Sequence, residues 1–574
     1  MKKIVILTFA MFAGLAHAQT PDKASFHLQA AMRAAPNEPV RAWVYFADKG
    51  GAHSAERELT ERARARRERN HIAIDGFDAP VSAAYVEAIA RPGVRVRHVS
   101  RWLNAVSVEA RASDLDRMAS LSFVRKMDRV RAFREAVPRD LVAPEAMAPP
   151  RDRTAFALDY GSSATQNAQI NVPALHDQGY SGSGVLIAML DAGFNNMGHE
   201  ALIDLDVLAT WDFVNGDSVV ADEVGQAGSG NHGTYTLSTI GGYEPGDLIG
   251  PAYGATYLLA KTENTDWERH VEEDDWIAGA EWADSMGADI ISSSLGYSYG
   301  FTNGDPDYAW TDMDGNTTIV AQGADIAASR GILVVNSAGN GGFVSLPANT
   351  LGSPADGDSV LAIGAVDGSG IRAGFSSVGP SSDGQIKPDV MAMGVGVFAA
   401  NPFGTALYSN VNGTSLACPL VAGVAALLLE ARPGATHLQI MDALRQTASQ
   451  SGSPDREYGF GIVDASEALD YIATGVGDTP ARAGAFLHPA HPNPFNPSTT
   501  IRYDLSVGAR VNVSIFDVRG ALVSTLVDEM QSAGNRSLVW NARDAEGRAL
   551  ASGVYLCRLD AGGVRQTRKL VLLK

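Results

Sequence analysis

Four residues of the sequence could together perform acyl transfer, and each stands where an apolar run ends or a helix is expected to begin. Asp191 closes the run GVLIAMLD, His232 lies in GSGNHGTYTLSTIGG, Asn340 in GILVVNSAGNGG, and Ser415 in NGTSLACPLVAGVAALLLEA. Acyl transfer at neutral pH needs a nucleophile, a base, a group that orients the base, and donors for the oxyanion. Serine, histidine, aspartate and asparagine can fill these roles, which indicates a hydrolase with a serine nucleophile.

Each placement taken alone has an ordinary structural explanation. An aspartate at a strand end is usually a turn or cap residue, and a serine before a helix is more often an N-cap than a nucleophile. Four such placements in one chain are much harder to explain in this way. The glycine turn before Ser415 leads directly into a long apolar helix, so the serine oxygen would lie at a helix N-terminus, which favours a developing negative charge.

Two further segments are expected to hold the substrate. Ser294, Leu295 and Gly296 follow the apolar run ADIIS, at a strand end that could lie against an extended peptide. Ala338 and Gly339 directly precede Asn340 and would line the same pocket. No acid stands at the expected floor of this pocket, which favours broad cleavage after apolar or aromatic residues.

The order Asp, His, Asn, Ser resembles that of the subtilisin family, the subtilases, and the block NGTSLACP is highly specific for it. The resemblance runs from about residue 159 to residue 472. It implies that Ser415 attacks the scissile carbonyl, His232 is general base and then acid, Asp191 orients the imidazole, and Asn340 donates to the oxyanion. A related carboxyl-dependent family shares the serine block but replaces the histidine and the asparagine with acids, so His232 and Asn340 argue against it.

The elements that must position these residues alternate between apolar strands and helices over residues 155–472. This alternation is typical of a parallel sheet covered by helices on both faces, where ligands gather at the carboxyl ends of the strands. We therefore expect an α/β, subtilisin-like catalytic domain over residues 151–474. Only two cysteines are present, Cys418 and Cys557, so stability is expected to come from core packing rather than from disulfides.

The N-terminal part of the chain is expected to be removed in two stages. Residues 1–18 have two lysines, an apolar run and a small-x-small triplet, which is the pattern of a secretory signal peptide cut after Ala18. Residues 19–150 form a small α+β unit that ends in a linker with four prolines. This unit resembles the inhibitory propeptide of subtilases, and its net charge of +5 would favour docking onto residues 151–484, whose net charge is −30.

The C-terminal part is expected to be a separate all-β domain. After a connector at residues 475–484, residues 485–574 show period-2 apolar runs separated by turn residues, which predicts an immunoglobulin-like β-sandwich. The segment HPNPFNPSTTIRYDL and the basic end RKLVLLK are similar to the C-terminal sorting domains of proteins exported by the type IX secretion system. An adhesive or merely stabilising sandwich is the alternative, because such modules are generic.

Cofactors and partners follow from the same observations. The expected chemistry requires no cofactor; structural calcium is left open, with no residues assigned to it. Asp312, Asp314 and Asn316 in WTDMDGNTT resemble the start of a calcium loop, but the closing Glu is missing and a surface turn explains them better. Protein or peptide substrates, the chain's own propeptide and the secretion machinery are the expected partners. The net charge of −30 disfavours nucleic acid, and no segment is long and apolar enough to span a membrane.

Two other interpretations remain open at this point. The protease fold could be a scaffold for binding or adhesion, which would be preferred if a member of the catalytic set were missing. The enzyme could also process specific partners rather than degrade protein in general. Acids at residues 272–275 stand at the start of an expected helix, where they are favourable. The alternative for them is a negative wall beside the cleft that selects basic substrates.

Overall fold

The computed structural model describes residues 23–50, 59–130, 157–226, 229–265, 271–298 and 307–473, and residues 485–573 with short gaps at 488–489, 491–492, 494, 506–507, 532–533 and 562–563. The expected signal peptide, proline-bearing linker and C-terminal connector therefore lie outside the described residues. The chain divides into two compact units. The first comprises residues up to 51, 81–99 and 103–130, and the second comprises residues 52–80, 100–102 and 131–574.

The first unit is a four-stranded sheet with helices. The strands β1 (Val40–Phe46), β2 (Arg95–Ser100), β3 (Ala105–Ala110) and β4 (Val124–Arg129) lie in the order β2-β3-β1-β4. The helices are α1 (Phe26–Ala34), α3 (Ala83–Ile89) and α4 (Ala112–Ala119). The central strand β1 pairs antiparallel with both neighbours and is almost wholly buried. The strand β2 is basic and only partly buried.

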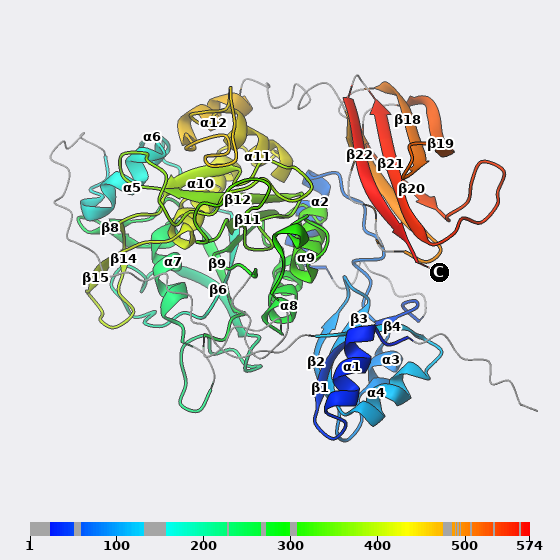
Figure 1. The fold of residues 1–574 in the computed structure, drawn as a ribbon. Helices are drawn as coiled ribbons and strands as arrows, with labels where there is room; N and C mark the ends of the chain where they lie inside the picture. The colour runs from blue at the N-terminus through cyan, green and yellow to red at the C-terminus, as the bar shows by residue number, and fades with distance from the viewer. Residues whose placement is uncertain are drawn as a thin grey trace, which may run out of the picture. The chain divides into compact units, whose positions relative to one another are not determined.

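The second unit is built on a seven-stranded parallel sheet (Figure 1). Its strands are β5 (Leu186–Asp191), β6 (Asp206–Asp212), β9 (Thr256–Lys261), β10 (Ile290–Ser293), β11 (Leu333–Ser337), β12 (Val360–Val366) and β13 (Val390–Met393). They lie in the order β13-β12-β11-β10-β5-β9-β6. Because β5 lies between β10 and β9, its last residue, Asp191, reaches the carboxyl edge near the middle of the sheet.

Helices cover both faces of this sheet, as expected for strands that are buried throughout. Along β5, Ile187 and Met189 belong to the core that contains α10 (Thr414–Ala431) and α7 (Asn231–Gly241). Leu190 points the other way, toward Gly279 of α8 (Val271–Met286). The helix α8 packs beside α9 (Ile319–Ser329) on that second face.

The remaining elements of this unit surround the sheet. The helices are α2 (Glu61–Arg69), α5 (Ala164–Gln169), α6 (Val172–His176), α11 (His437–Gln446) and α12 (Ala465–Ala473), with 3-10 turns at Gly161–Ser163 and Trp310–Asp312. The short strand pairs are β7 (Tyr243–Glu244) with β8 (Leu248–Ile249), and β14 (Val397–Ala400) with β15 (Tyr408–Val411).

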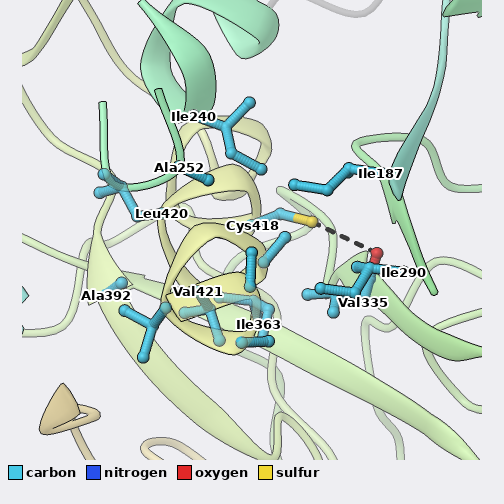
Figure 2. Packing of buried hydrophobic residues seen from close by; sticks show 14 of the residues in the cluster. Ile187, Ile240, Ala252, Ile290, Val335, Ile363, Ala392, Cys418, Leu420 and Val421 are labelled. Atoms are coloured by element: carbon cyan, nitrogen blue, oxygen red, sulfur yellow. Dashed lines mark hydrogen bonds between the residues drawn. The ribbon is translucent and has the colours of Figure 1, made fainter. Parts of the chain in front are cut away.

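The helix α10 forms the centre of the core. Nearly all of its residues are buried. Contrary to the expectation from the sequence, it is long and apolar enough to cross a bilayer, and among the described helices it is the one that is, but its burial inside the fold identifies it as a core helix. Figure 2 shows Cys418 of α10 among apolar side chains from the sheet, with its thiol pointing toward a strand carbonyl. Burial raises the pKa of this thiol to about 12, so it is an unreactive core residue. Both cysteines are free, as predicted.

The C-terminal residues form two antiparallel sheets. One contains β16 (Ala485–Leu487), β17 (Thr499–Leu505) and β20 (Gly534–Trp540); the other contains β18 (Ala509–Asp517), β19 (Leu522–Gln531), β21 (Gly553–Ala561) and β22 (Val564–Leu572). A single apolar core gathers residues from both sheets, including Ile501, Trp540, Val513 and Leu559. The predicted fold class, a parallel sheet flanked by helices with an α+β unit before it and an all-β sandwich after it, is confirmed.

One carboxylate connects the end of α10 to the start of β5. The Oε2 of Glu430 accepts hydrogen bonds from the backbone N–H groups of Ser181, Gly182 and Ser183, at 2.7, 2.6 and 3.1 Å. These three residues form the turn that leads into β5. Glu430 thereby holds the helix that carries Ser415 against the strand that ends with Asp191.

We expect Glu430→Ala to lower the free energy of unfolding of this unit by about 2–3 kcal/mol, because three backbone donors lose a charged acceptor. Glu430→Gln is the matched control, since its amide oxygen can still accept, and it should cost less than half as much. Urea unfolding followed by tryptophan fluorescence measures both. Equal losses for the two variants would show that the carboxylate does not hold this turn.

Candidate active site

Asp191 and His232 are in direct contact. The Nδ1 of His232 lies 2.6 Å from the Oδ1 of Asp191, which is almost completely buried. Because an ionised carboxylate can only accept hydrogen bonds, Nδ1 carries the proton and Nε2 is the basic nitrogen. The other contacts of Asp191 hold its carboxylate still: Ala192 N–H donates to Oδ1 at 2.7 Å, and the Thr236 hydroxyl donates to Oδ2 at 2.8 Å.

Two glycines let the helix that carries His232 approach the end of β5. Gly193 turns the chain after the strand with φ +119°, a conformation that side chains disfavour. Gly233 lies in the first turn of α7, and a Cβ there would fall 2.1 Å from the carbonyl oxygen of Gly193. Larger residues at either position would push His232 away from Asp191.

Ser415 lies in the first turn of α10 and is buried except for a small fraction of its surface. Its Oγ is 3.4 Å from the carbonyl oxygen of Ser294. The Ser294 hydroxyl in turn donates to the carbonyl oxygen of Ser415 at 2.8 Å. These two contacts therefore bind the start of α10 to Ser294, which belongs to the segment expected to hold substrate.

Asn340 is oriented by the residue before Ser415. Its Oδ1 accepts hydrogen bonds from the backbone N–H and from the hydroxyl of Thr414, both at 3.0 Å. With the amide oxygen held there, the NH₂ group is the part of the side chain that can donate to a substrate oxygen. Gly339 N–H approaches the same hydroxyl at 3.3 Å, which fixes the loop.

Contacts from the core indicate that the two halves of the site lie close together. The helices α7 and α10 pack against each other, and α7 also packs against β5. Cys418 stands one turn after Ser415 on α10. Its thiol lies 3.5 Å from the carbonyl oxygen of Ser293, and Ser293 pairs with Leu190, the residue before Asp191. The first turns of α10 therefore lie at the end of the sheet where β5 ends in Asp191.

The expected substrate segments are joined to their neighbours by contacts of backbone groups. Leu295 offers its carbonyl oxygen to the side chain of Asn336 at 2.9 Å. Gly296 faces Gly352 so closely that a Cβ on Gly352 would lie 3.1 Å from the Cα of Gly296. The next residues pair in antiparallel fashion, with Tyr297 N–H donating to Ser353 O at 2.8 Å and Ser353 N–H to Tyr297 O at 3.0 Å.

The second segment joins the same frame. Ala338 N–H donates to the carbonyl of Ile363 at 2.9 Å, and Gly352 N–H donates to the carbonyl of Ala338 at 3.0 Å. The carbonyl of Gly339 accepts from Ser377 N–H at 3.0 Å. Through Gly352, which also packs against Gly296, the structure brings residues 294–296 and 338–339 to one place.

The acids at the start of α8 do not form an exposed wall. Glu272, Glu273, Asp274 and Asp275 are all at most 2 % exposed. Glu272 accepts from the backbone N–H of Asn264 at 2.8 Å, and Glu273 accepts from the Tyr308 hydroxyl at 3.0 Å. These side chains accept hydrogen bonds inside the protein, near the start of the helix. They are therefore not available as a negative wall that selects basic substrates.

The expected turn at Asp314 is present. Its Oδ1 accepts from Asn316 N–H at 3.0 Å and from Thr317 N–H at 2.7 Å, which closes a tight loop. Over the part of the chain that the structure describes, no group of three or more His, Cys, Asp or Glu side chains could hold a metal ion. No residue is therefore assigned to calcium.

Two residues of the site were not identified from the sequence. Thr236 orients Asp191, and Thr414 orients Asn340. Thr236 stands four residues after His232, on the same face of the expected helix, so helical spacing could have indicated it. Thr414 is adjacent to Ser415, but its partner is 74 residues away, which no local pattern shows.

Comparison with known proteins agrees with this geometry. Residues 182–461 match the model of the subtilase family. Subtilisin NAT of Bacillus subtilis subsp. natto and subtilisin E of Bacillus subtilis are each 32 % identical over 398 residues, which is 68 % of this chain and 87 % of theirs. The chain belongs to the subtilase family. A subtilisin of Bacillus pumilus is 36 % identical over 318 residues, 55 % of this subtilase and 99 % of that protein.

The flanking parts of this subtilase also match known families. Residues 41–142 match the peptidase S8 propeptide domain of Bacteroidota, in agreement with the expected propeptide. Residues 496–563 match the FlgD Ig-like domain. This match supports an immunoglobulin-like domain but is not a match to a type IX sorting domain. As a subtilase with this propeptide, the protein is a serine endopeptidase made as a zymogen.

Proposed function

We propose that this subtilase is a secreted endopeptidase that hydrolyses peptide bonds through an acyl-enzyme on Ser415. The observation that carries the proposal is the 2.6 Å contact between His232 Nδ1 and Asp191 Oδ1, because it leaves Nε2 as the base. The position of Ser415 in the first turn of α10, the helix that packs against the helix of His232, supports the same assignment. The scaffold alternative would be preferred only if a member of the catalytic set were missing, and all four residues are present.

In the proposed reaction, Ser415 Oγ attacks the scissile carbonyl carbon while His232 Nε2 takes the hydroxyl proton. The tetrahedral oxyanion accepts a hydrogen bond from the NH₂ of Asn340, and Asp191 stabilises the imidazolium. The imidazolium then gives its proton to the leaving amine as the C–N bond breaks. His232 then takes a proton from water, whose oxygen attacks the acyl carbon. As the bond to Oγ breaks, the imidazolium returns this proton to Ser415 Oγ, and the carboxylate product leaves.

The substrate is proposed to lie extended along residues 294–296, with its reacting carbonyl next to residues 338–340. Backbone groups dominate this surface, so the binding is expected to depend little on the substrate's sequence. The N-terminal residues are proposed to occupy the enzyme as its intramolecular inhibitor until the linker is cut, which the match to a propeptide family supports.

We expect Thr236→Val to lower kcat/KM about tenfold on a fluorogenic peptide, because the Asp191 carboxylate loses a hydrogen bond that orients it. Thr239→Val is the matched control: it lies on the same helix, and its hydroxyl donates to the helical carbonyl of Tyr235 at 2.9 Å.

Asn340→Ala should lower kcat about 10²–10³-fold with little change in KM, because the oxyanion loses a donor. Full activity in Asn340→Ala and Thr236→Val would contradict the assigned roles.

We also propose that the signal peptide exports the chain and that residues 485–574 act as a type IX sorting signal, through the periplasm to the medium or cell surface. The segments HPNPFNPSTTIRYDL and RKLVLLK support this proposal, whereas the match to an immunoglobulin-like domain fits an adhesive or stabilising module equally well. Deleting residues 485–574 should leave a protease that has lost residues 1–18 and stays in the periplasm of the native host. Release of the truncated protease at the full-length level would instead indicate an adhesive or stabilising module.

A further inference from the structure

An arginine-rich helix from the N-terminal part of the chain belongs to the second compact unit, which also holds the catalytic residues and which we call the catalytic unit. The helix α2 has the sequence ERARARRER, and Thr60 caps it by accepting from Ala63 N–H at 3.2 Å. Residues 52–80 cluster with the catalytic residues and not with the four-stranded sheet unit. Two arginines of α2, Arg66 and Arg67, are only 1 % exposed, which is rare for this residue type.

Arg66 binds the carboxyl ends of two catalytic helices. Its guanidinium donates to the carbonyl of Ala288, just after α8, and to the carbonyl of Arg330, just after α9, the latter at 3.1 Å. It also donates to the carboxylate of Asp284 in the last turn of α8. Helix C-termini carry partial negative charge and unpaired carbonyls, so a buried cation is favourable there.

Asp284 is the centre of the buried charges. Both of its oxygens accept from Arg67 at 3.0 Å, and Arg101 donates to it at 2.6 Å. Burial alone would raise the pKa of this carboxyl, but the charges of Arg66, Arg67 and Arg101 outweigh it and hold the pKa below its ordinary value. The carboxylate is therefore charged at neutral pH, and the arginines that pair with it all come from the N-terminal part of the chain.

A second carboxylate extends the contact to the catalytic sheet. Asp289 pairs with Arg62 at 2.5 Å and with Arg69 at 2.8 Å. The same carboxylate accepts from the backbone N–H of Leu186, the first residue of β5, at 3.1 Å. At the far end of α2, Asn70 accepts from the backbone N–H of His437 at 3.0 Å, the first residue of α11.

An arginine at the end of α9 also contacts the residues that follow α2. Arg330, itself only 1 % exposed, donates to Asp75 at 2.9 Å and lies 3.4 Å from Asp78. Its guanidinium lies 5.2 Å from the centre of the Phe77 ring. Contact thus continues beyond α2 to residue 78, so we call residues 59–80 the anchor segment.

Removal of the anchor segment would leave Asp284, Asp289 and Arg330 without these partners. Charge-assisted hydrogen bonds that are shielded from water, several of them on each carboxylate, favour a complex that dissociates slowly. We propose that the anchor segment remains bound after maturation, as a permanent non-covalent part of the active enzyme, while the four-stranded sheet unit is removed. The inference rests on the proposed maturation by linker cleavage.

The direct test is mass spectrometry, under denaturing conditions, of the active enzyme purified from the medium by size exclusion. We expect a peptide that contains residues 59–80, without residues 23–50, in about equal amount to the catalytic chain. Fully active enzyme with no peptide from residues 59–80 would overturn the inference and leave the proposed proteolysis untouched. Absence of both trimming and hydrolysis would instead contradict the proposed function.

A second test needs no catalysis. The Ser415→Ala chain carries a recognition site for a specific protease inserted within residues 131–150, is cut there, and is separated by size exclusion at pH 7. Adding Asp284→Asn or Arg67→Ala should weaken the binding of the N-terminal fragment at least about tenfold. Controls are Asp204→Asn and Arg64→Ala, both exposed. Circular dichroism before cutting checks that each chain is folded, and binding equal to that of the controls would overturn the inference.

Discussion

The active site depends on one buried carboxylate that must be fully hydrogen-bonded. Asp191 ends a strand in the middle of a parallel sheet, where an unpaired charge would be costly. His232, Thr236 and the backbone N–H of Ala192 supply its donors, and two of them come from α7. The close packing of α7 on the end of β5 thus satisfies the carboxylate and sets the imidazole tautomer at once.

Buried carboxylates at the other end of the sheet also need hydrogen-bond donors, and in the zymogen the N-terminal residues supply them. Asp284 and Asp289 lie at the amino ends of the strands, on the side away from Ser415, and N-terminal arginines neutralise both. A helix that supplies these arginines helps to complete the fold of the catalytic unit. Some of the opposite charges behind the net values of +5 and −30 thus meet in a few buried ion pairs.

Much of the fold could be predicted because local pattern and tertiary environment agree. The runs that end in Asp191, Ser293 and Ser337 are strands of one sheet, and the block around Ser415 begins a buried helix. The candidate residues were found because each stands at such an element end. What sequence could not show are side-chain partners distant along the chain, such as Thr414 with Asn340, or Arg66 with Asp284. The burial of the α2 arginines could not be predicted either, because burial of charge has no local signal in the sequence.

The central claim is that Asp191, His232 and Ser415 act as one nucleophilic unit. A phosphonofluoridate, which reacts with activated serine hydroxyls, followed by peptide mass spectrometry, tests it most directly. The account predicts one adduct for each active chain, on Ser415, and labelling slowed at least roughly hundredfold in Asp191→Asn. Labelling of another serine, or equal rates with and without the Asp191 carboxylate, would contradict it.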